Sequence, residues 1–453
     1  MVWGPAYKNE KHYFGVEMNL IKFALKEGAD DIIIEKNSGE TKQIRFANNS
    51  ITILNKWDMT IYKIFLSLKK RIISTMLFDA SEESVKDSIK SLIKNARLLQ
   101  PNEEYFGIAE GPFKYKLIKN TFDKKVINAD VADLANAIIN SALENSKSVS
   151  GVVYTSYNER ELESSNSISA SEKTTALQLS ARAFNKDEES GHAALCSRIL
   201  CKIDPNEIGK KAGEISKLAK NPEKIEAGKY DIIFEPLAIA NLLNLVSRSA
   251  SSFFVDSGFS FLKDKLNKKI GSLNVNLIDS GRIENGYAST MFDDEGVPTQ
   301  TTPIIEKGIL KNYLHNTSTA RKYKTKTTAN AGLIAPSPIN TILKQGKLSK
   351  EKMFKEIKNG LYVTNVWYTR FQNYLTGEFS TIPRDGIFLI RDGEIAKSVK
   401  DIRITDNLQT VLENFIGLSN KPEWIIWWGL ENQIPVLTPY VLVKNVNITK
   451  STM

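Results

Sequence analysis

One stretch in the second half of the chain reads STMFDDEGVPT, at residues 289–299. In it, three carboxylates, Asp293, Asp294 and Glu295, stand directly before Gly296. Clustered carboxylates attract positive charge, so the stretch is a candidate site for a cation or for the amino terminus of a substrate. A turn facing an inner cavity is the alternative, because glycine permits a positive φ and aspartate side chains bond to the neighbouring backbone.

The sequence upstream of this stretch predicts the start of a separate unit. Residues 221–229 contain a proline and a glycine and are typical of a boundary. A strand is expected at residues 230–235, and Pro236 then stands at the favourable first position of a helix over residues 237–252. Strands and hairpins follow, with a last helix over residues 349–359.

The first half of the chain also mixes helices with strands. Helices are expected over residues 18–27, 81–99, 130–145 and 204–219, and Ser81 is a candidate N-cap for the second of them. Alternating apolar residues predict strands at residues 31–36, 41–46, 51–54, 58–68, 71–78, 148–159, 160–167 and 173–184. The polar residues at 37–40 and 48–50 are expected to form turns between the first three strands.

This order of elements favours an α+β fold with largely antiparallel sheets over a doubly wound parallel sheet, because helices and strands do not alternate strictly. We expect an N-terminal α+β domain over residues 18–220, with sub-parts at about 18–120 and 121–220. A larger C-terminal α+β domain is expected over residues 221–453. Residues 1–17 lack the apolar core of a secretory signal, so we expect a tail there and treat Met18 as a candidate start.

Composition limits the classes of function. The chain has 61 Lys+Arg against 52 Asp+Glu, a net charge of +9, but its basic residues are scattered, which makes nucleic acid an unexpected partner. No apolar run approaches the roughly 20 residues of a membrane span, so a cytoplasmic location is expected. The two cysteines, Cys196 and Cys201, form neither a disulfide framework nor a zinc cluster.

Several further blocks accompany the stretch at residues 289–299. They are KEGAD at 26–30, IIEKGIL at 304–310, GLYVT at 360–364, LTGEFS at 375–380 and RDGEI at 391–395. Together with FDDEGVPT, these blocks resemble the TldD/PmbA family, and the resemblance extends over about residues 18–446. It implies the α+β fold of that family, with an N-terminal domain and a larger C-terminal domain.

The resemblance also implies a division into two branches. The TldD branch is a zinc metallopeptidase with an HExxxH motif on a helix early in the C-terminal domain and a late cysteine as third ligand. Two histidines on one helix hold zinc, the glutamate activates the bound water, and zinc polarises the scissile carbonyl. The PmbA (TldE) branch lacks this motif and pairs with a TldD-like subunit.

This chain departs from the zinc pattern. None of its three histidines, His12, His192 and His315, is followed by glutamate, and no two are close in sequence. The helix expected at residues 237–252 has Asn244, Leu245 and Ser249 at the positions of His, Glu and His, with no histidine nearby. The late segment at 427–433 reads WWGLENQ, without cysteine. We therefore expect no catalytic and no metal-ligating residue here, and zinc only in a TldD-like partner.

Two aromatic stretches are further candidates. Tyr368, Arg370 and Tyr374 lie in an aromatic and polar loop that suits peptide contact, with an ordinary surface loop as the alternative. The tryptophan-rich residues 424–428 form either an interface anchor or a core strand.

Three functions remain open on the sequence. The resemblance implies a non-catalytic subunit of a TldD/TldE-type metallopeptidase complex, paired with an HExxxH subunit or with itself, that acts on peptides or short unfolded chains. A stand-alone hydrolase without zinc is the first alternative, although no GxSxG motif is present. A binding module is the second, and a steep salt dependence of binding would support a nucleic-acid ligand.

Overall fold

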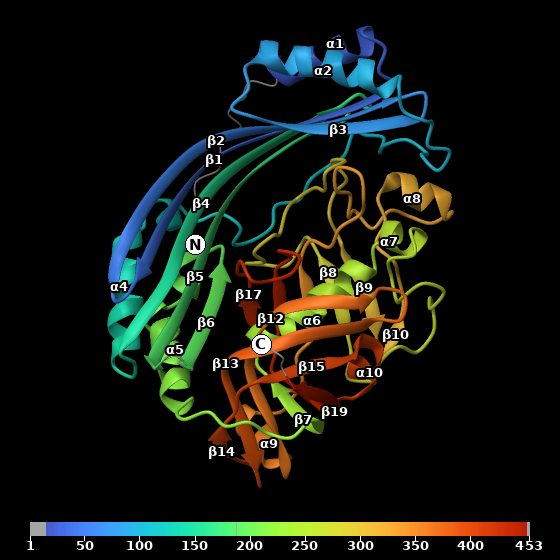
Figure 1. Ribbon diagram of the computed structural model, residues 1–453. Coiled ribbons are helices and arrows are strands. Elements are labelled where there is room, and N and C mark those ends of the chain that lie inside the picture. The colour runs from blue at the N-terminus through green and yellow to red at the C-terminus, as the bar shows by residue number, and fades with distance from the viewer. Residues whose placement is uncertain (1–14, 187, 451–453) are drawn as a thin grey trace, which may run out of the picture.

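The structure, a computed structural model, describes residues 15–186 and 188–450, and Figure 1 shows their arrangement. Three sheets lie in these residues: one is formed by residues 31–197, and the other two are formed by residues 228–450. The predicted domain boundary at residues 220–221 falls between α5 (Pro205–Leu218) and β7 (Gly228–Phe234). Most of the predicted tail, residues 1–14, lies outside the described residues.

The N-terminal sheet has six antiparallel strands in the order β3-β2-β1-β4-β5-β6. The strands are β1 (Asp31–Ala47), β2 (Ser50–Leu68), β3 (Arg71–Phe78), β4 (Ser148–Ser164), β5 (Ser169–Lys186) and β6 (Glu189–Ser197). In Figure 1 the long strands β1, β2, β4 and β5 arch around one side of the molecule. Their curvature leaves a concave face toward the C-terminal part, residues 228–450.

The turn predicted at residues 37–40 is wrong. These residues continue β1 as one extended strand, with Gly39 paired to Met59 of β2 and to Asn158 of β4. A Cβ atom at Gly39 would overlap the carbonyl oxygen of Tyr157, so glycine serves close strand approach here. Pairing on both sides of the strand overrides the local turn propensity of this segment. The turn at residues 48–50 is confirmed, and Asn48 and Asn49 have positive φ there.

One face of this sheet is covered by helices. Ile32 and Ile34 of β1 pack against α1 (Gly15–Lys26) and α2 (Glu82–Ala96), and Ile44 and Phe46 contribute to a second core with α4 (Val131–Leu143) and α5. Ser81 caps α2 as predicted, since its hydroxyl accepts from Ser84 N at 3.2 Å. Side chains alternate along a strand, so the odd-numbered residues of β1 face the C-terminal part.

The C-terminal part contains two sheets, ordered β10-β9-β8-β11-β18-β17 and β12-β7-β19-β15-β13-β14. The first comprises β8 (Leu277–Ser280), β9 (Thr301–Glu306), β10 (Ile309–Leu310), β11 (Thr341–Leu343), β17 (Glu423–Ile425) and β18 (Val436–Thr438). The second comprises β7, β12 (Asn359–Asn373), β13 (Glu378–Arg391), β14 (Glu394–Ser398), β15 (Ile402–Asn407) and β19 (Val441–Lys450), with β16 (Phe415–Leu418) paired to β19. All pairs are antiparallel except β7–β12 and β11–β18, which confirms the α+β fold with largely antiparallel sheets.

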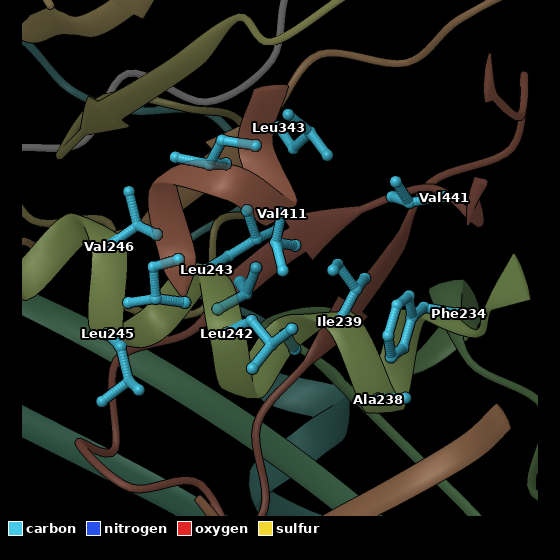
Figure 2. Close-up of a cluster of buried hydrophobic side chains, with 14 of the residues drawn as sticks. Phe234, Ala238, Ile239, Leu242, Leu243, Leu245, Val246, Leu343, Val411 and Val441 are labelled. Carbon is cyan, nitrogen blue, oxygen red and sulfur yellow. The ribbon is translucent and has the colours of Figure 1, made fainter. Parts of the chain in front are cut away.

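Helix α6 (Pro236–Ser249) forms the centre of the C-terminal core. Every residue of this helix is buried except Arg248, as expected of a helix that is apolar nearly all round. Figure 2 shows Leu242, Leu243 and Ile239 of this helix on the side of Val411 of α10 (Leu408–Glu413) and Val441 of β19, whereas Leu245 points away from them. The helix ends three residues earlier than predicted, and α7 (Ser252–Asp256) follows.

The remaining helices are short. They are α3 (Lys124–Ile127), the 3₁₀ turn at Leu200–Lys202, α8 (Thr317–Lys322) and α9 (Lys350–Lys355). The predicted last helix at 349–359 therefore ends early, because β12 begins at Asn359, and α10 was not predicted. Of the helices within residues 15–186 and 188–450, none is both long and apolar enough to cross a membrane.

Candidate functional site

The carboxylates predicted as a site form a tight turn on the path between β8 and β9. Oδ1 of Asp293 accepts hydrogen bonds from the backbone N–H groups of Glu295 and Val297, both at 3.0 Å. Its Oδ2 accepts from Ala331 N at 2.9 Å. Asp293 therefore binds backbone on both of its oxygens, and its side chain organises the turn.

Gly296 is required by this turn for two reasons. Its φ is +80°, in the region that glycine adopts without strain. A Cβ atom at this position would also overlap the side chain of Ile168, which projects from the loop before β5. The hydroxyl of Tyr115 donates to its carbonyl oxygen at 2.7 Å. The stretch is thus packed against the N-terminal sheet at its glycine.

Asp294 points to Arg160 of β4, which joins the turn to the N-terminal sheet. Nη2 of Arg160 donates to Oδ1 of Asp294 at 2.6 Å, and Nη1 donates to the carbonyl oxygen of Phe292 at 2.8 Å. Nε of the same guanidinium donates to Glu35 of β1 at 2.8 Å, and Lys63 of β2 lies 2.8 Å from the other Glu35 oxygen. Burial alone would raise the pKa of Glu35, but these two cations outweigh it and lower the pKa to about 2.

The turn also borders a small cavity of about 170 Å³. Asp294 and Glu295 line it together with Glu104, Asp256 and Lys322. Burial raises the pKa of Glu295 to about 7, although a hydrogen bond from Thr317 N at 3.2 Å favours the charged form. Lys322 forms ion pairs with Glu104 and Asp256 in this cavity, and a cation or an amino group as its ligand stays a prediction.

The aromatic loop predicted to contact peptide lines a different cavity, of about 260 Å³, beside α6. Arg370 and Tyr374 contribute to its wall from β12 and the following turn. We call it the aromatic pocket, and its lining comprises Leu245, Arg248, Ser249, Phe254, Phe259, Arg370, Phe371, Tyr374 and Glu431. The pocket is mainly apolar with a few charged groups at its rim, as is usual for a binding site for organic ligands.

The polar groups of the aromatic pocket are held in place by one another. Arg370 forms an ion pair with Glu431, and its guanidinium lies 4.6 Å from the ring of Tyr368. The ring of Tyr374 packs edge-on against Phe259 at a centroid distance of 5.6 Å. Tyr368 itself is not part of the lining. The seven predicted site residues thus form two groups, one at the turn and one at the aromatic pocket, and neither of these two cavities is lined by residues of both groups.

Helix α6 and the late segment at residues 427–434 meet at Asn244. Nδ2 of Asn244 donates to the carbonyl oxygen of Ile434 at 2.7 Å, and Oδ1 accepts from Asn432 N at 3.1 Å. In the TldD branch that the chain resembles, the helix carries the HExxxH motif and the late segment carries the cysteine ligand. In this chain, an amide joins the helix to the late segment by hydrogen bonds, while Leu245 and Ser249 face the aromatic pocket.

These residues do not fit a zinc ion. An asparagine amide, a leucine and a serine supply none of the imidazole, thiolate or carboxylate donors that zinc prefers. In the part of the chain that the structure describes, no group of three His, Cys, Asp or Glu side chains could hold a metal. His192 and His315 are both buried, and burial lowers the pKa of each to about 4, while His12 lies outside the described residues.

The tryptophan-rich residues 424–428 divide between core and surface. Ile425, Ile426 and Trp427 are buried, whereas Trp428 is 64% exposed. The core alternative therefore describes Ile425, Ile426 and Trp427, and an interface anchor at the exposed Trp428 stays a prediction.

The sequence did not identify several residues of the aromatic pocket. Glu431 lies in the late segment that lacks the family's cysteine, and Phe259 lies 111 positions before Arg370 in the chain. Only an approach of distant segments places them together, so no local pattern marks them. Arg248 gave one local signal, because it is the single charged residue of α6.

Comparison with known proteins gives consistent matches. Residues 227–450 match the family model described as PmbA/TldA metallopeptidase C-terminal domain. A metalloprotease of Methanothermobacter thermautotrophicus is 31% identical over 294 residues, which are 60% of this chain and 64% of that protein. Metalloprotease PmbA of Escherichia coli O157:H7 is 29% identical over 240 residues, 53% of this chain and 52% of that protein.

A solved structure extends the likeness to the whole fold. TldE from Thermococcus kodakarensis superposes with a TM-score of 0.86 over 96% of this chain and 100% of its own, at 22% identity, which concerns the fold alone. The alignments to the first curated relatives span 64%, 42% and 65% of those proteins, less than two thirds of their length. Residues 227–450 thus belong to the PmbA/TldD family as its C-terminal domain, and the solved structure shows the same fold over 96% of the chain.

Proposed function

We propose that this chain is a non-catalytic, TldE/PmbA-like subunit of a TldD/TldE-type zinc metallopeptidase that acts on peptides or short unfolded chains in the cytoplasm. In this proposal it binds peptide and holds a TldD-like subunit, which supplies the HExxxH motif and the zinc. A homodimer is the alternative assembly.

One observation carries this proposal. At the place where α6 meets the late segment, Asn244 makes hydrogen bonds to the backbone at Asn432 and Ile434, and an aromatic pocket opens beside it. A peptidase without its metal and base can still bind an extended peptide if it keeps a pocket for side chains. The relatives named metalloproteases support a peptide as the class of substrate.

The free half of β2 supports a partner subunit. Residues 50–60 of this strand pair with β1 but not with β3, whose pairing begins at Ile61. Large apolar side chains are exposed along this half and on β3, namely Leu54, Trp57, Met59, Met76 and Phe78. An exposed strand edge with apolar residues is a surface that another chain can cover. We assign this surface to the HExxxH subunit.

The test mixes the purified chain with an HExxxH-containing paralogue from the same cell and measures cleavage of casein-derived peptides. The lone chain should be inert and free of zinc, and the mixture should co-elute and cleave peptides in a chelator-sensitive way. Leu54→Asp combined with Trp57→Asp should prevent co-elution. Leu117→Asp, which changes another exposed leucine, should not. Cleavage by the lone chain would overturn the proposal.

One pair of side chains, Ser180 and His192, favours the alternative of a stand-alone hydrolase. Oγ of Ser180 lies 2.9 Å from Nε2 of His192, and both residues are buried beside a cavity. Nδ1 of His192, however, lies 3.0 Å from Nδ2 of Asn365, an atom that also donates to Oδ2 of Asp385 at 3.1 Å. An amide nitrogen donates only, so Nδ1 accepts and the imidazole proton stays on Nε2.

This tautomer opposes a nucleophilic role for Ser180. A general base must present an unprotonated nitrogen to the serine hydroxyl, whereas His192 donates its Nε2–H to Ser180. Cleavage by the lone chain that disappears in Ser180→Ala would favour the hydrolase over the subunit. Cleavage by the mixture that survives in Ser180→Ala is the result that the proposed function predicts.

A further inference from the structure

A third and larger cavity, of about 700 Å³, lies between the concave face of the N-terminal sheet and the C-terminal part. The odd-numbered residues Gln43 and Arg45 of β1 line one wall, and Ser180 and Arg182 of β5 continue it. The opposite wall comes from β13 and residues 427–428. None of the seven predicted site residues lines it, and its volume is in the range of ligand-binding pockets.

The charge of this cavity is positive. Its charged side chains are three arginines, Arg45, Arg182 and Arg384, and one aspartate, Asp385. Asp385 is fully bound, since it accepts from Nε of Arg182 at 2.5 Å and from Oγ of Ser190 at 2.8 Å, and Nε of Arg384 forms an ion pair with its other oxygen at 3.0 Å. Burial alone would raise the pKa of Asp385, but Arg182 and Arg384 keep it below its ordinary value. Two positive charges are therefore left unbalanced.

Arg45 is the most available of these cations. Its side chain is exposed to the cavity and solvent, and no ion pair involves it among residues 15–186 and 188–450. A guanidinium without a carboxylate partner, facing a concave wall, attracts anions and can bind a carboxylate through two parallel hydrogen bonds.

A directed chain of hydrogen bonds ends at the same cavity. The ionised Asp385 fixes the amide of Asn365, because a carbonyl oxygen turned toward the carboxylate would be repelled. The Asn365 amide then donates to Nδ1 of His192, and His192 donates through Nε2 to Ser180. His192 is neutral near pH 7, because burial lowers its pKa to about 4. The hydroxyl proton of Ser180 is thereby turned away from His192 and is available to a ligand.

Aromatic side chains close one side of the cavity. Trp427 is buried, with its ring edge-on to His192 at a centroid distance of 4.7 Å. Trp428 follows it and is 64% exposed. An exposed tryptophan beside a positive cavity can cover an apolar side chain next to a bound anionic group.

We propose that this cavity binds a carboxylate at the C-terminus of a peptide, with Arg45 and Ser180 as its donors and Trp428 against the last side chain. The anion site is independent of the function proposed above, and only the choice of a peptide as carrier of the carboxylate rests on that function.

The experiment measures binding to the intact chain, without any partner, by isothermal titration calorimetry. The probes are an N-acetylated tetrapeptide with a free C-terminal carboxylate, the same peptide ending in a carboxamide, and a carboxamide peptide with one internal aspartate. We expect the free acid to bind at least tenfold more tightly than either amide. Equal affinities for the acid and the plain amide would overturn the anion site, as would the absence of binding by all three probes.

Two variants locate the site. Arg45→Gln should weaken binding of the free acid at least fivefold, and Ser180→Ala should weaken it severalfold. Arg97→Gln, which removes an exposed arginine at the end of α2, should leave the affinity within twofold of the unmodified chain. Equal effects of Arg45→Gln and Arg97→Gln would overturn the assignment to this cavity. An internal aspartate that binds as tightly as the free acid would overturn the C-terminal specificity.

The two proposals fail separately. Free-acid binding that depends on Arg45, with no peptidase activity in the mixture with the HExxxH subunit, would leave the anion site standing and reject the subunit function. Active mixtures that cleave acid and amide peptides equally, and are unaffected by Arg45→Gln, would reject the anion site alone.

Discussion

The carboxylate turn at residues 293–296 and the aromatic pocket beside α6 differ in how their polar groups are bound. Asp293 accepts three backbone hydrogen bonds, and Asp294 is held by Arg160 from the other half of the chain. In the aromatic pocket, Arg370 forms an ion pair with Glu431 at a half-exposed rim, and Tyr374 is 48% exposed. Charged residues in a sequence signature can thus join two parts of a fold, while a less distinctive loop lines an open pocket.

This difference predicts two kinds of variant. Changes at the turn should alter the free energy of unfolding, because they affect buried and mutually dependent contacts. Changes at the aromatic pocket should leave stability nearly unchanged and alter the handling of peptide, because its side chains are partly solvated and make few contacts that the fold requires.

Arg160→Met has the largest expected effect on stability. It leaves the carboxylates of Glu35 and Asp294 without their guanidinium partner in a buried site. Removal of one partner from a buried ion pair destabilises a protein by about 3–5 kcal/mol, and urea denaturation measures the change. The control is Lys173→Met, which breaks the exposed pair with Glu159 and should cost no more than about 0.5 kcal/mol. Equal effects of the two variants would show that the turn network is not a structural connection.

Glu295→Gln should change the pH dependence of stability. Burial raises the pKa of Glu295 from 4.5 to about 7, so between these values the folded state keeps a proton that the unfolded state has lost. The stabilisation is complete below pH 4.5 and is lost as the pH rises through 7, and it amounts to at most about 3 kcal/mol. Glutamine stays neutral, so the variant should match the unmodified chain at pH 4.5 and exceed it at pH 8. A stability difference that does not vary between these pH values would contradict the role of burial.

Gly296→Ala tests the shape of the turn against a matched glycine. Gly258 has a similar φ, +75° against +80°, but a Cβ atom there would meet no other atom within 4 Å. Both substitutions introduce backbone strain of about 1–2 kcal/mol, and only Gly296→Ala also forces a side chain into Ile168. Overpacking adds about 1–3 kcal/mol, so we expect a difference of that size between the two variants in urea denaturation. Similar losses would mean that Ile168 moves aside without strain.

Local signals in the sequence predicted the local features of the fold. Ser81 caps α2 and Gly296 takes a positive φ, because capping and turn conformations depend on one or two residues. The α+β class with largely antiparallel sheets followed from the order of the elements and is confirmed. The prediction of a turn at residues 37–40 was wrong, because pairing of β1 with two strands determines the conformation of these residues.

The candidate sites were predicted less completely than the fold. The sequence marked Asp294 and Arg370, but gave no sign that Arg160 and Glu431 are their partners. Each pair joins residues more than sixty positions apart, so its formation depends on the packing of whole sheets. Asn244 was recognised only as an absence of histidine, and its hydrogen bonds to the late segment emerge from the structure.

Arg370→Met should have the smallest effect on stability and the most selective effect on function. Its ion pair with Glu431 is half exposed, so its loss should change the free energy of unfolding by less than about 1 kcal/mol. If the aromatic pocket holds a peptide side chain, the variant mixed with the HExxxH subunit should show a raised KM for peptides with an unchanged kcat. Arg321→Met, which removes a similarly exposed arginine from its pair with Glu110, should leave KM unchanged.

The stability and the KM of Arg370→Met test different claims. A stable variant with a raised KM would separate the pocket from the turn, since a variant at the turn such as Arg160→Met reduces activity only through loss of folded protein. A stable variant with an unchanged KM would mean that Arg370 belongs to an ordinary surface loop. The peptide would then have to be sought at the positive cavity that Arg45 lines, where the arginine has no carboxylate partner to displace among the described residues.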